Sequence, residues 1–226
     1  MTRLVAVVLM LRLAALASGD VIWDQSNYDT SVPALIDQEF PDYPTYSSYM
    51  GTDVYVGFPW CLPSVTTYFT KGYGHWPVGQ RIPARLNIIP RVGCNLPGNQ
   101  YDPSVGTKPP SVRGKVMAQL LDLGNALALN VPWVGIDLPA GEYWIGLTPI
   151  LSYGEYGQEF HLGAPIVDCN TAWRNPGGSF GYGSDWNWAH ALGYWQNTHD
   201  AAMKIGCGFA PEPTSLLLFV LTAPLI

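Results

Sequence analysis

The chain carries few charged side chains, and few basic ones in particular. Charged residues make up 12% of the 226 residues, which is about half of their share in an average soluble domain. Eleven basic side chains stand against 17 acidic ones, and the net charge is −6. Because an acidic surface repels phosphate backbones, we expect no nucleic-acid partner.

Local motifs for metal or cofactor chemistry are also missing. The sequence contains no Cys-x-x-Cys pair, no His-x-x-x-His and no His-Glu-x-x-His. We therefore predict no catalytic residue, no metal site and no cofactor. Two alternatives stay open. His190, His199 and Asp200 could meet as metal ligands, although ordinary loop histidines explain them as well. Carboxylates could pair for glycoside cleavage, since their separation is a property of the fold; the candidates are Glu39, Glu142, Glu155 and Glu159.

Glycine, proline and aromatic residues are abundant instead. The chain has 24 Gly, 20 Pro, 9 Trp and 13 Tyr, and apolar–polar alternation prevails over helical periodicity. This pattern predicts an all-β domain, an antiparallel β-sandwich or jelly roll with long loops. The expected strands cover residues 21–25, 65–70, 85–89, 112–123, 127–131, 141–148 and 201–205.

Residues 141–148 form the clearest of these strands. Tyr143, Ile145 and Leu147 fall on one face, while Trp144 and Gly146 fall on the other. Pro90 is expected to end the strand over 85–89, because proline lacks the N–H that a ladder needs. The Gly124-Asn125 turn predicts a hairpin between the two strands that flank it.

Two segments, 24–51 and 170–198, are expected to be long loops. The second contains the best candidates for ligand binding. A sugar ring stacks on an exposed indole, and a neighbouring carboxylate or amide binds its hydroxyls; the candidates are Trp173, Asp185, Trp186, Asn187 and Trp188. The alternative is that these tryptophans cover the core beneath the loop.

The N-terminus has the pattern of a cleaved signal peptide. A basic start at Arg3 precedes an apolar run over 4–11, and Ala15-Leu16-Ala17 matches a signal-peptidase site. We expect cleavage after Ala17. The run of eight residues is short against the roughly 20 that a spanning helix needs.

Export makes disulfides the favoured state of the four cysteines. Cys61, Cys94, Cys169 and Cys207 can pair in three ways. The simplest pairing is the local one, Cys61 with Cys94 and Cys169 with Cys207. Free buried thiols are the alternative.

The C-terminus combines Pro211-Glu212-Pro213 with an apolar run that starts at Leu216. This arrangement resembles the PEP-CTERM sorting tail of exported bacterial proteins, in which a Pro-Glu-Pro motif precedes a hydrophobic helix and a basic cluster. The segment over 138–145 is similar to the Leu-x-Ala-Gly-x-Tyr-Trp strand of many β-sandwich proteins that carry this tail, and the start at Trp23-Asp24 looks similar too. The resemblance implies processing by exosortase, a membrane enzyme, in bacteria that make exopolysaccharide.

The tail departs from that pattern at its end. Eleven residues follow Ser215, about 16 Å of helix against a hydrocarbon core of about 30 Å. Pro224 interrupts them, and no basic residue follows. We expect a short hydrophobic C-terminal helix, and either the tail is truncated relative to the family or it has lost its function.

Together these features predict three parts: a signal peptide over 1–17, a β-sandwich domain over 18–208 and a sorting tail over 209–226. The expected function is that of a non-catalytic protein of the cell surface or extracellular matrix. Its expected partners are exosortase and the membrane during sorting, and exopolysaccharide. A lectin-like carbohydrate-binding module and a secreted hydrolase are the alternatives, because fold and address alone underdetermine activity.

Overall fold

A computed structural model of the chain describes residues 21–31, 34–62, 64–71, 74–97, 112–193 and 199–206. The predicted signal peptide, the predicted sorting tail with its expected helix, and Cys207 lie outside these residues. Within them, no helix is long and apolar enough to cross a membrane.

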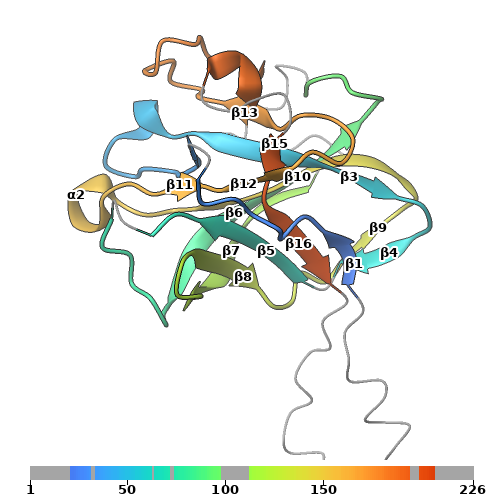
Figure 1. Ribbon diagram of the computed structural model, residues 1–226, viewed down its shortest axis with the longest axis horizontal. Coiled ribbons are helices and arrows are strands. Elements are labelled where there is room, and N and C mark those ends of the chain that lie inside the picture. Colours follow the sequence, from blue (N-terminus) through green and yellow to red (C-terminus); the bar gives the residue numbers. More distant parts are fainter. Residues whose placement is uncertain are drawn as a thin grey trace, which may run out of the picture.

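The domain is all-β, as predicted, and twelve of its strands join in one curled antiparallel sheet (Figure 1). Across the sheet the strands follow the order β1 (Val21–Asp24), β16 (Met203–Gly206), β5 (Ser64–Phe69), β8 (Leu127–Val131), β7 (Val112–Asp122), β6 (Arg81–Arg91), β10 (Gly141–Pro149), β3 (Tyr49–Val56), β13 (Ala172–Arg174) and β14 (Asn187–Trp188). β11 (Phe160–His161) pairs with β5 and with β2 (Leu35–Ile36).

Shorter elements lie outside this sheet. Two small ladders pair β12 (Gly163–Pro165) with β15 (His199–Ala201) and β4 (Trp60–Leu62) with β9 (Ile136–Leu138). The helical turns are η1 (Pro44–Tyr46), α2 (Tyr153–Tyr156) and η2 (Ala189–Leu192).

The main core lies inside the curl of the sheet. It takes Phe69 from β5, Leu129 from β8, Leu86 from β6 and Ile145 from β10, all almost fully buried. β5 also contacts β10 across this core, because the Thr67 hydroxyl donates to the Leu147 carbonyl at 3.2 Å. The sheet thus closes on its own apolar face, and no helix is needed to cover it.

The alternation predicted for residues 141–148 is confirmed in β10. Tyr143, Ile145 and Leu147 belong to the main core, whereas Trp144 packs on the other face against Cys169 and Trp186. The predicted hairpin is confirmed as well: β7 and β8 pair, and Gly124 takes a positive φ of 88° in the turn.

Two expectations about strand limits are wrong. β6 does not end at Pro90 but runs to Arg91. Pro90 lies beyond Ile88, the last residue of β6 that pairs with the described part of β7, so its missing N–H interrupts no ladder bond on that side. The expected strand over 201–205 is divided between β15 and β16, with Ala202 between them.

The predicted long loops also contain more structure than expected. The segment 24–51 includes β2, η1 and the start of β3, and the segment 170–198 includes β13, β14 and η2. These strands are two to eight residues long and lack a clear alternation of apolar and polar side chains. In β3, for example, six of the first seven side chains are buried, because the strand is covered on both faces.

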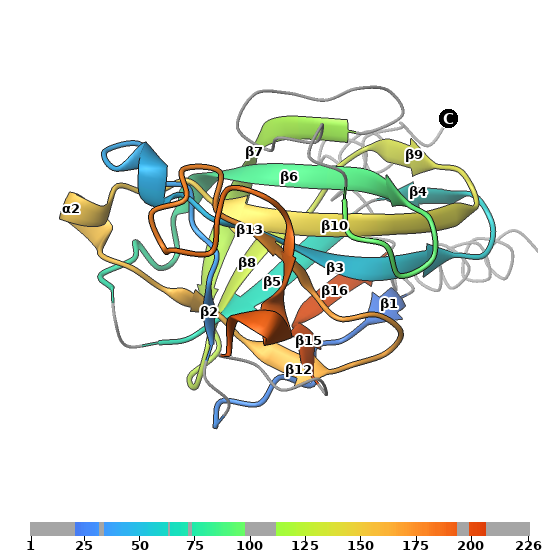
Figure 2. The ribbon, with the colours of Figure 1, turned by 90° about the horizontal axis from the view of Figure 1, so that it is seen from above.

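The two ends of the described chain lie together. Val21 of β1 stands opposite Gly206 of β16. Both views place this edge far from α2 and η1, at the opposite end of the domain (Figures 1 and 2).

We predict that Gly146→Ala destabilises the domain by about 3 kcal/mol or more, because an added Cβ would lie 1.9 Å from the Met50 carbonyl oxygen of β3. Gly114→Ala in β7 is the matched control, since its Cβ would meet no atom within 4 Å. Urea unfolding of both variants measures the difference. Equal midpoints would contradict this account of how β10 and β3 approach each other.

Candidate functional site

An aromatic pocket lies at the end of the domain that holds α2 and η1. Its walls are Phe40, Tyr43, Tyr46, Tyr153, Gln158 and Phe180, and its volume is about 300 Å³. Its three tyrosines are about half exposed, with exposed fractions of 53% at Tyr43, 45% at Tyr46 and 51% at Tyr153. Large aromatic residues gathered at a concave surface are typical of ligand sites.

The rings of this pocket stand edge to face. Tyr43 and Tyr153 have centroids 6.0 Å apart at 83°, and Tyr46 and Phe180 have centroids 5.6 Å apart at 76°. Phe40 meets Tyr153 at 6.1 Å and 73°. In such T-shaped pairs the edge of one ring meets the face of the other, so each contact covers one face of one ring, whereas a parallel stack covers a face of both.

Hydrogen bonds bring the pocket's segments together. The Asp42 carboxylate accepts from the backbone N–H groups of Tyr153 and Gly154 at 2.9 and 2.8 Å, which holds α2 beside Tyr43. The Asn175 amide donates to the carbonyls of Thr45 and Ser47, both at 2.8 Å, and so attaches the loop that carries Phe180. Gly177 permits this contact, since a Cβ there would lie 2.2 Å from the Thr45 carbonyl oxygen.

A second, more polar hollow of about 510 Å³ shares Phe40 with the aromatic pocket. Its polar lining comes from Glu39, Thr45, Ser47, Tyr49 and Lys115. Arg85 holds the Glu39 carboxylate in a bidentate pair at 2.7 and 2.5 Å, and the Tyr49 hydroxyl donates to the same carboxylate at 3.0 Å. We refer to this second space as the polar hollow.

The tryptophans proposed from the sequence as sugar-binding residues are mostly part of the core. Trp173 and Trp186 are buried, with exposed fractions of 1% and 6%, and the Trp173 indole donates to the Ile36 carbonyl. Trp188 is partly buried against Trp144. The alternative noted from the sequence, that these rings cover the core, therefore agrees with their burial.

The two polar candidates of that group lie nearby without joining the aromatic pocket. Asp185 is exposed, and the Asn187 amide is directed to the backbone carbonyls of Tyr182 and Asp185 at 3.2 and 2.8 Å. The segment 170–198, in which the sequence placed these candidates, also carries Phe180, which lines the aromatic pocket; the five candidates themselves do not line it.

The structure contains one disulfide among the described residues, Cys94–Cys169. It joins the segment after β6 to the segment after β12 across 75 residues, with Cα atoms 5.6 Å apart. The expected pairing of Cys61 with Cys94 is therefore wrong, and so is that of Cys169 with Cys207. Sequence proximity favoured the local pairing, but the fold brings two distant segments together.

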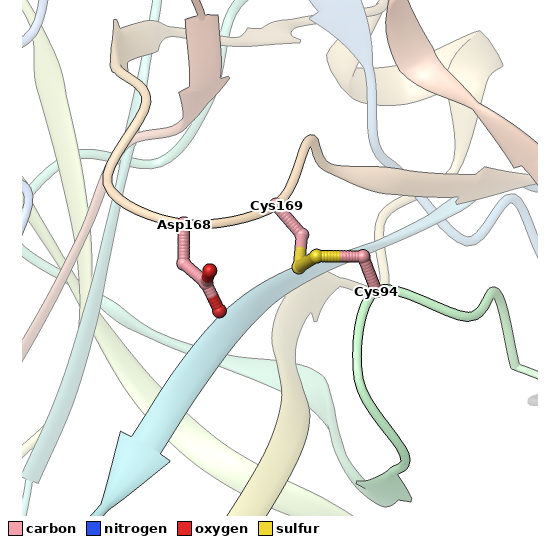
Figure 3. Close-up of side chains that lie close together, drawn as sticks. All are labelled: Cys94, Asp168 and Cys169. Carbon is pink, nitrogen blue, oxygen red and sulfur yellow. A yellow bond between two sulfur atoms is a disulfide. The ribbon is translucent and has the colours of Figure 1, made fainter.

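Asp168 lies beside this disulfide, and Figure 3 shows the three side chains together. Two sulfurs and a carboxylate at this spacing have the composition of a metal site. However, the sulfurs are bonded to each other and are not thiolates, which are the form that binds metals. Asp168 instead accepts from Arg91 Nη2 at 2.6 Å. Within the described residues, His190, His199 and Asp200 do not come together as a group of possible metal ligands.

Beneath Arg91 lie two buried carboxyls, Asp53 and Asp200. Asp200 accepts hydrogen bonds from the Thr171 hydroxyl, the Ala201 N–H and the Gln25 amide. Asp53 accepts from the Cys169 N–H at 3.1 Å. Its other oxygen, Oδ1, has no N–H or O–H donor among the described residues.

The two carboxyls interact directly. Burial raises the pKa of both, and for Asp200 the nearby Asp53 charge raises the pKa further, well above its usual range. Two buried carboxyls in contact cannot both ionise at low cost, so we infer that they share one proton.

Asp37 and His161 form a second buried pair. His161 Nδ1 lies 2.9 Å from Asp37 Oδ2, and His161 Nε2 lies 3.0 Å from the Ala202 carbonyl oxygen. The Thr148 hydroxyl donates to Asp37, and burial raises the pKa of this carboxyl. Every polar atom of the imidazole has a partner, so the pair ties β11 to the segment after β2.

Two of the other carboxylates considered for glycoside cleavage have structural partners. Glu159 accepts from the Gly74 N–H and the Thr70 hydroxyl, and Glu142 accepts from the Gly93 N–H. Glu155 is exposed in the first turn of α2. Of this group, Glu39 is the one that lines the polar hollow.

The sequence also contains a Gly-x-Ser-x-Gly spacing at Gly177, Ser179 and Gly181. In hydrolases this motif turns from a strand into a helix. Here residues 176–185 form turns and bends between β13 and β14, without a helix that follows the serine. The spacing therefore lacks the context of a nucleophile elbow.

The residues of the aromatic pocket were not recognised from the sequence. Tyr43 and Tyr46 lie in the segment that was expected to be a loop with scattered tyrosines. One signal could have identified them: Pro41 and Pro44 bracket Tyr43, and prolines with an aspartate between them favour a fixed turn that exposes its neighbours.

The chain matches no protein-family model, no curated protein and no solved structure.

We predict that Asp53→Asn reduces the pH dependence of stability. The folded chain keeps a proton on the Asp53–Asp200 pair that the unfolded chain releases near the ordinary pKa of about 3.9. The free energy of unfolding of the wild type should therefore fall as pH rises above about 4, until the pH passes the raised pKa. In the variant the Asp53 charge that raises the pKa of Asp200 is gone, so the slope should become shallower. Burial still raises the pKa of Asp200 and of Asp37, so part of the slope should remain.

Urea unfolding between pH 4 and 8 measures this effect, with Asp137→Asn at an exposed position as the control. A slope that persists unchanged in Asp53→Asn would contradict a shared proton.

We also predict that replacing both bonded cysteines by serine, at Cys94 and Cys169, lowers the free energy of unfolding by about 4 kcal/mol, since the bond closes a loop of 75 residues. Chemical unfolding of the double variant measures the loss. Wild type treated with a reductant should lose a similar amount, whereas a wild type insensitive to reductant would argue against the bond.

Proposed function

We propose that this chain is an exported, non-catalytic protein of the cell surface or extracellular matrix, sorted through its PEP-CTERM-like tail. The observation that carries the proposal is the Cys94–Cys169 disulfide, which links segments 75 residues apart. Disulfides persist in oxidising compartments and are rare in the cytosol, so the bond is compatible with the signal-peptide pattern at the N-terminus.

The placement of the chain ends supports the same proposal. Because Val21 stands opposite Gly206, the leader and the tail both join the domain at the β1–β16 edge. A tail held in the membrane would therefore place this edge next to it. α2, which carries Tyr153 of the aromatic pocket, lies at the far end of the domain from β1 (Figure 1). In this proposal exosortase and the membrane are partners during sorting.

We regard the curled sheet as a β-sandwich of the kind that the sequence predicts. In this view β5 and β16 belong to one layer, and β10 and β3 belong to the other. The contact that supports it is that of Thr67 with Leu147, in which the Thr67 hydroxyl of β5 donates to the Leu147 carbonyl of β10 at 3.2 Å.

A secreted hydrolase is less well supported. Asp53 and Asp200 are fully buried, and neither contributes to the aromatic pocket or to the polar hollow. Glu39 lines the hollow, but Arg85 and Tyr49 already engage its carboxylate. A glycosidase needs a second carboxyl on the other side of the scissile bond.

The test is the intact mass of the protein secreted by an exosortase-positive bacterial host, before and after reduction. We expect loss of residues 1–17 and breakage near Pro211, and a gain of about two mass units for each disulfide reduced. A product that retains Ile226 would overturn sorting through the tail. A product that retains its N-terminus inside the cell would overturn export.

A matched variant separates the motif from the apolar run. Replacing Pro211-Glu212-Pro213 by three alanines leaves the residues after Ser215 unchanged. We expect this variant to keep its C-terminus in the same host. Equal processing of both chains would overturn recognition of the motif.

A further inference from the structure

We propose that the aromatic pocket and the adjoining polar hollow form one binding site for a neutral saccharide chain. This inference adds a ligand to the proposed surface role, and it does not depend on whether the tail is processed.

The first argument comes from the aromatic rings. Tyr43, Tyr46 and Tyr153 are about half exposed around a concave space, and each edge-to-face contact covers one face of only one ring in the pair. The face of an aromatic ring is its electron-rich side and attracts the C–H groups on the apolar face of a sugar ring. Tyrosine provides this contact at low cost in side-chain entropy.

The second argument comes from the polar hollow. A saccharide has hydroxyls that both donate and accept, so its site needs groups of both kinds. Lys115 donates, Thr45 and Ser47 have hydroxyls, and the Gln158 amide of the neighbouring pocket offers both functions. The described contacts of Glu39 occupy three of about four acceptor positions on its carboxylate, which leaves room for a hydroxyl donor.

Size and charge narrow the ligand class. The two spaces measure about 300 and 510 Å³ and share Phe40, which suits a few sugar rings better than a folded protein surface. Charges of both signs surround them: Arg85 neutralises Glu39, and Lys115 and Asp42 add one of each sign. A site without an excess of either sign favours a neutral chain over an acidic one.

A proline-rich peptide is the main competitor, because such peptides also dock on aromatic grooves. Its backbone, however, offers mainly carbonyl acceptors. The Glu39 carboxylate, which can only accept, would then face a ligand with few donors. The composition of the polar hollow therefore favours a ligand with hydroxyl groups.

The experiment is affinity electrophoresis and titration calorimetry of the full chain with soluble neutral polysaccharides: β-glucan, mannan, xylan and galactan. Polygalacturonate and a polyproline peptide complete the panel. We expect saturable binding to at least one neutral polymer. Tyr43→Ala and Tyr153→Ala should each weaken it by roughly tenfold, the effect of about 1.4 kcal/mol.

Two further variants make the test specific. Tyr55→Ala removes an equally exposed tyrosine on β3 outside the site and should leave the affinity within about twofold of wild type. Tyr153→Phe keeps the ring and loses the hydroxyl, so it should retain most of the affinity if stacking is the contact. Thermal unfolding of each variant confirms that the domain is intact.

Three results would overturn the proposal: no affinity for any neutral polymer, binding that Tyr43→Ala and Tyr153→Ala leave unchanged, or binding confined to polygalacturonate or to the polyproline peptide. Each is independent of the mass of the secreted product, so failure here would leave the sorting proposal standing, and the reverse also holds.

Discussion

The close contact between β10 and β3 is the constraint on which the rest of this structure depends. β10 pairs with β6 on one side and with β3 on the other, and its side chains supply the main core on one face and the Trp144 cluster on the other. Gly146 lets the chain of β3 pass close to β10 near Met50, where any Cβ would meet the carbonyl. The residues at the start of β3, Tyr49–Gly51, pair with β13.

This change of partner places the candidate site. Residues Thr52–Val56 of β3 pair with β10, while Tyr49–Gly51 pair with β13. The chain before β3 is thereby led to the end of the domain, where η1 and the loop after β13 meet through Asn175. The aromatic pocket forms there because the same packing leaves three tyrosines at the surface.

The placement of the buried polar groups is set by a different constraint, the cost of burying a charge. Asp53 and Asp200 lie under Arg91, and Asp37 is paired with His161. An unpaired buried carboxylate costs several kcal/mol, so each must have hydrogen-bond donors or keep its proton. These groups join segments that are distant in sequence, as the disulfide does, and none of them lines the aromatic pocket or the polar hollow. Their placement is consistent with a role in specifying the fold.

Local pattern alone determined that this domain is all-β, because alternation and turn residues act over a few positions. The two faces of β10 and the β7–β8 hairpin could be predicted for that reason. The tertiary structure alone decided the rest. Three features depend on contacts between segments more than 70 residues apart: the burial of Trp173, the cysteine that bonds to Cys94, and the tyrosines that line a cavity. The local pattern of a segment does not encode which distant segment it will contact.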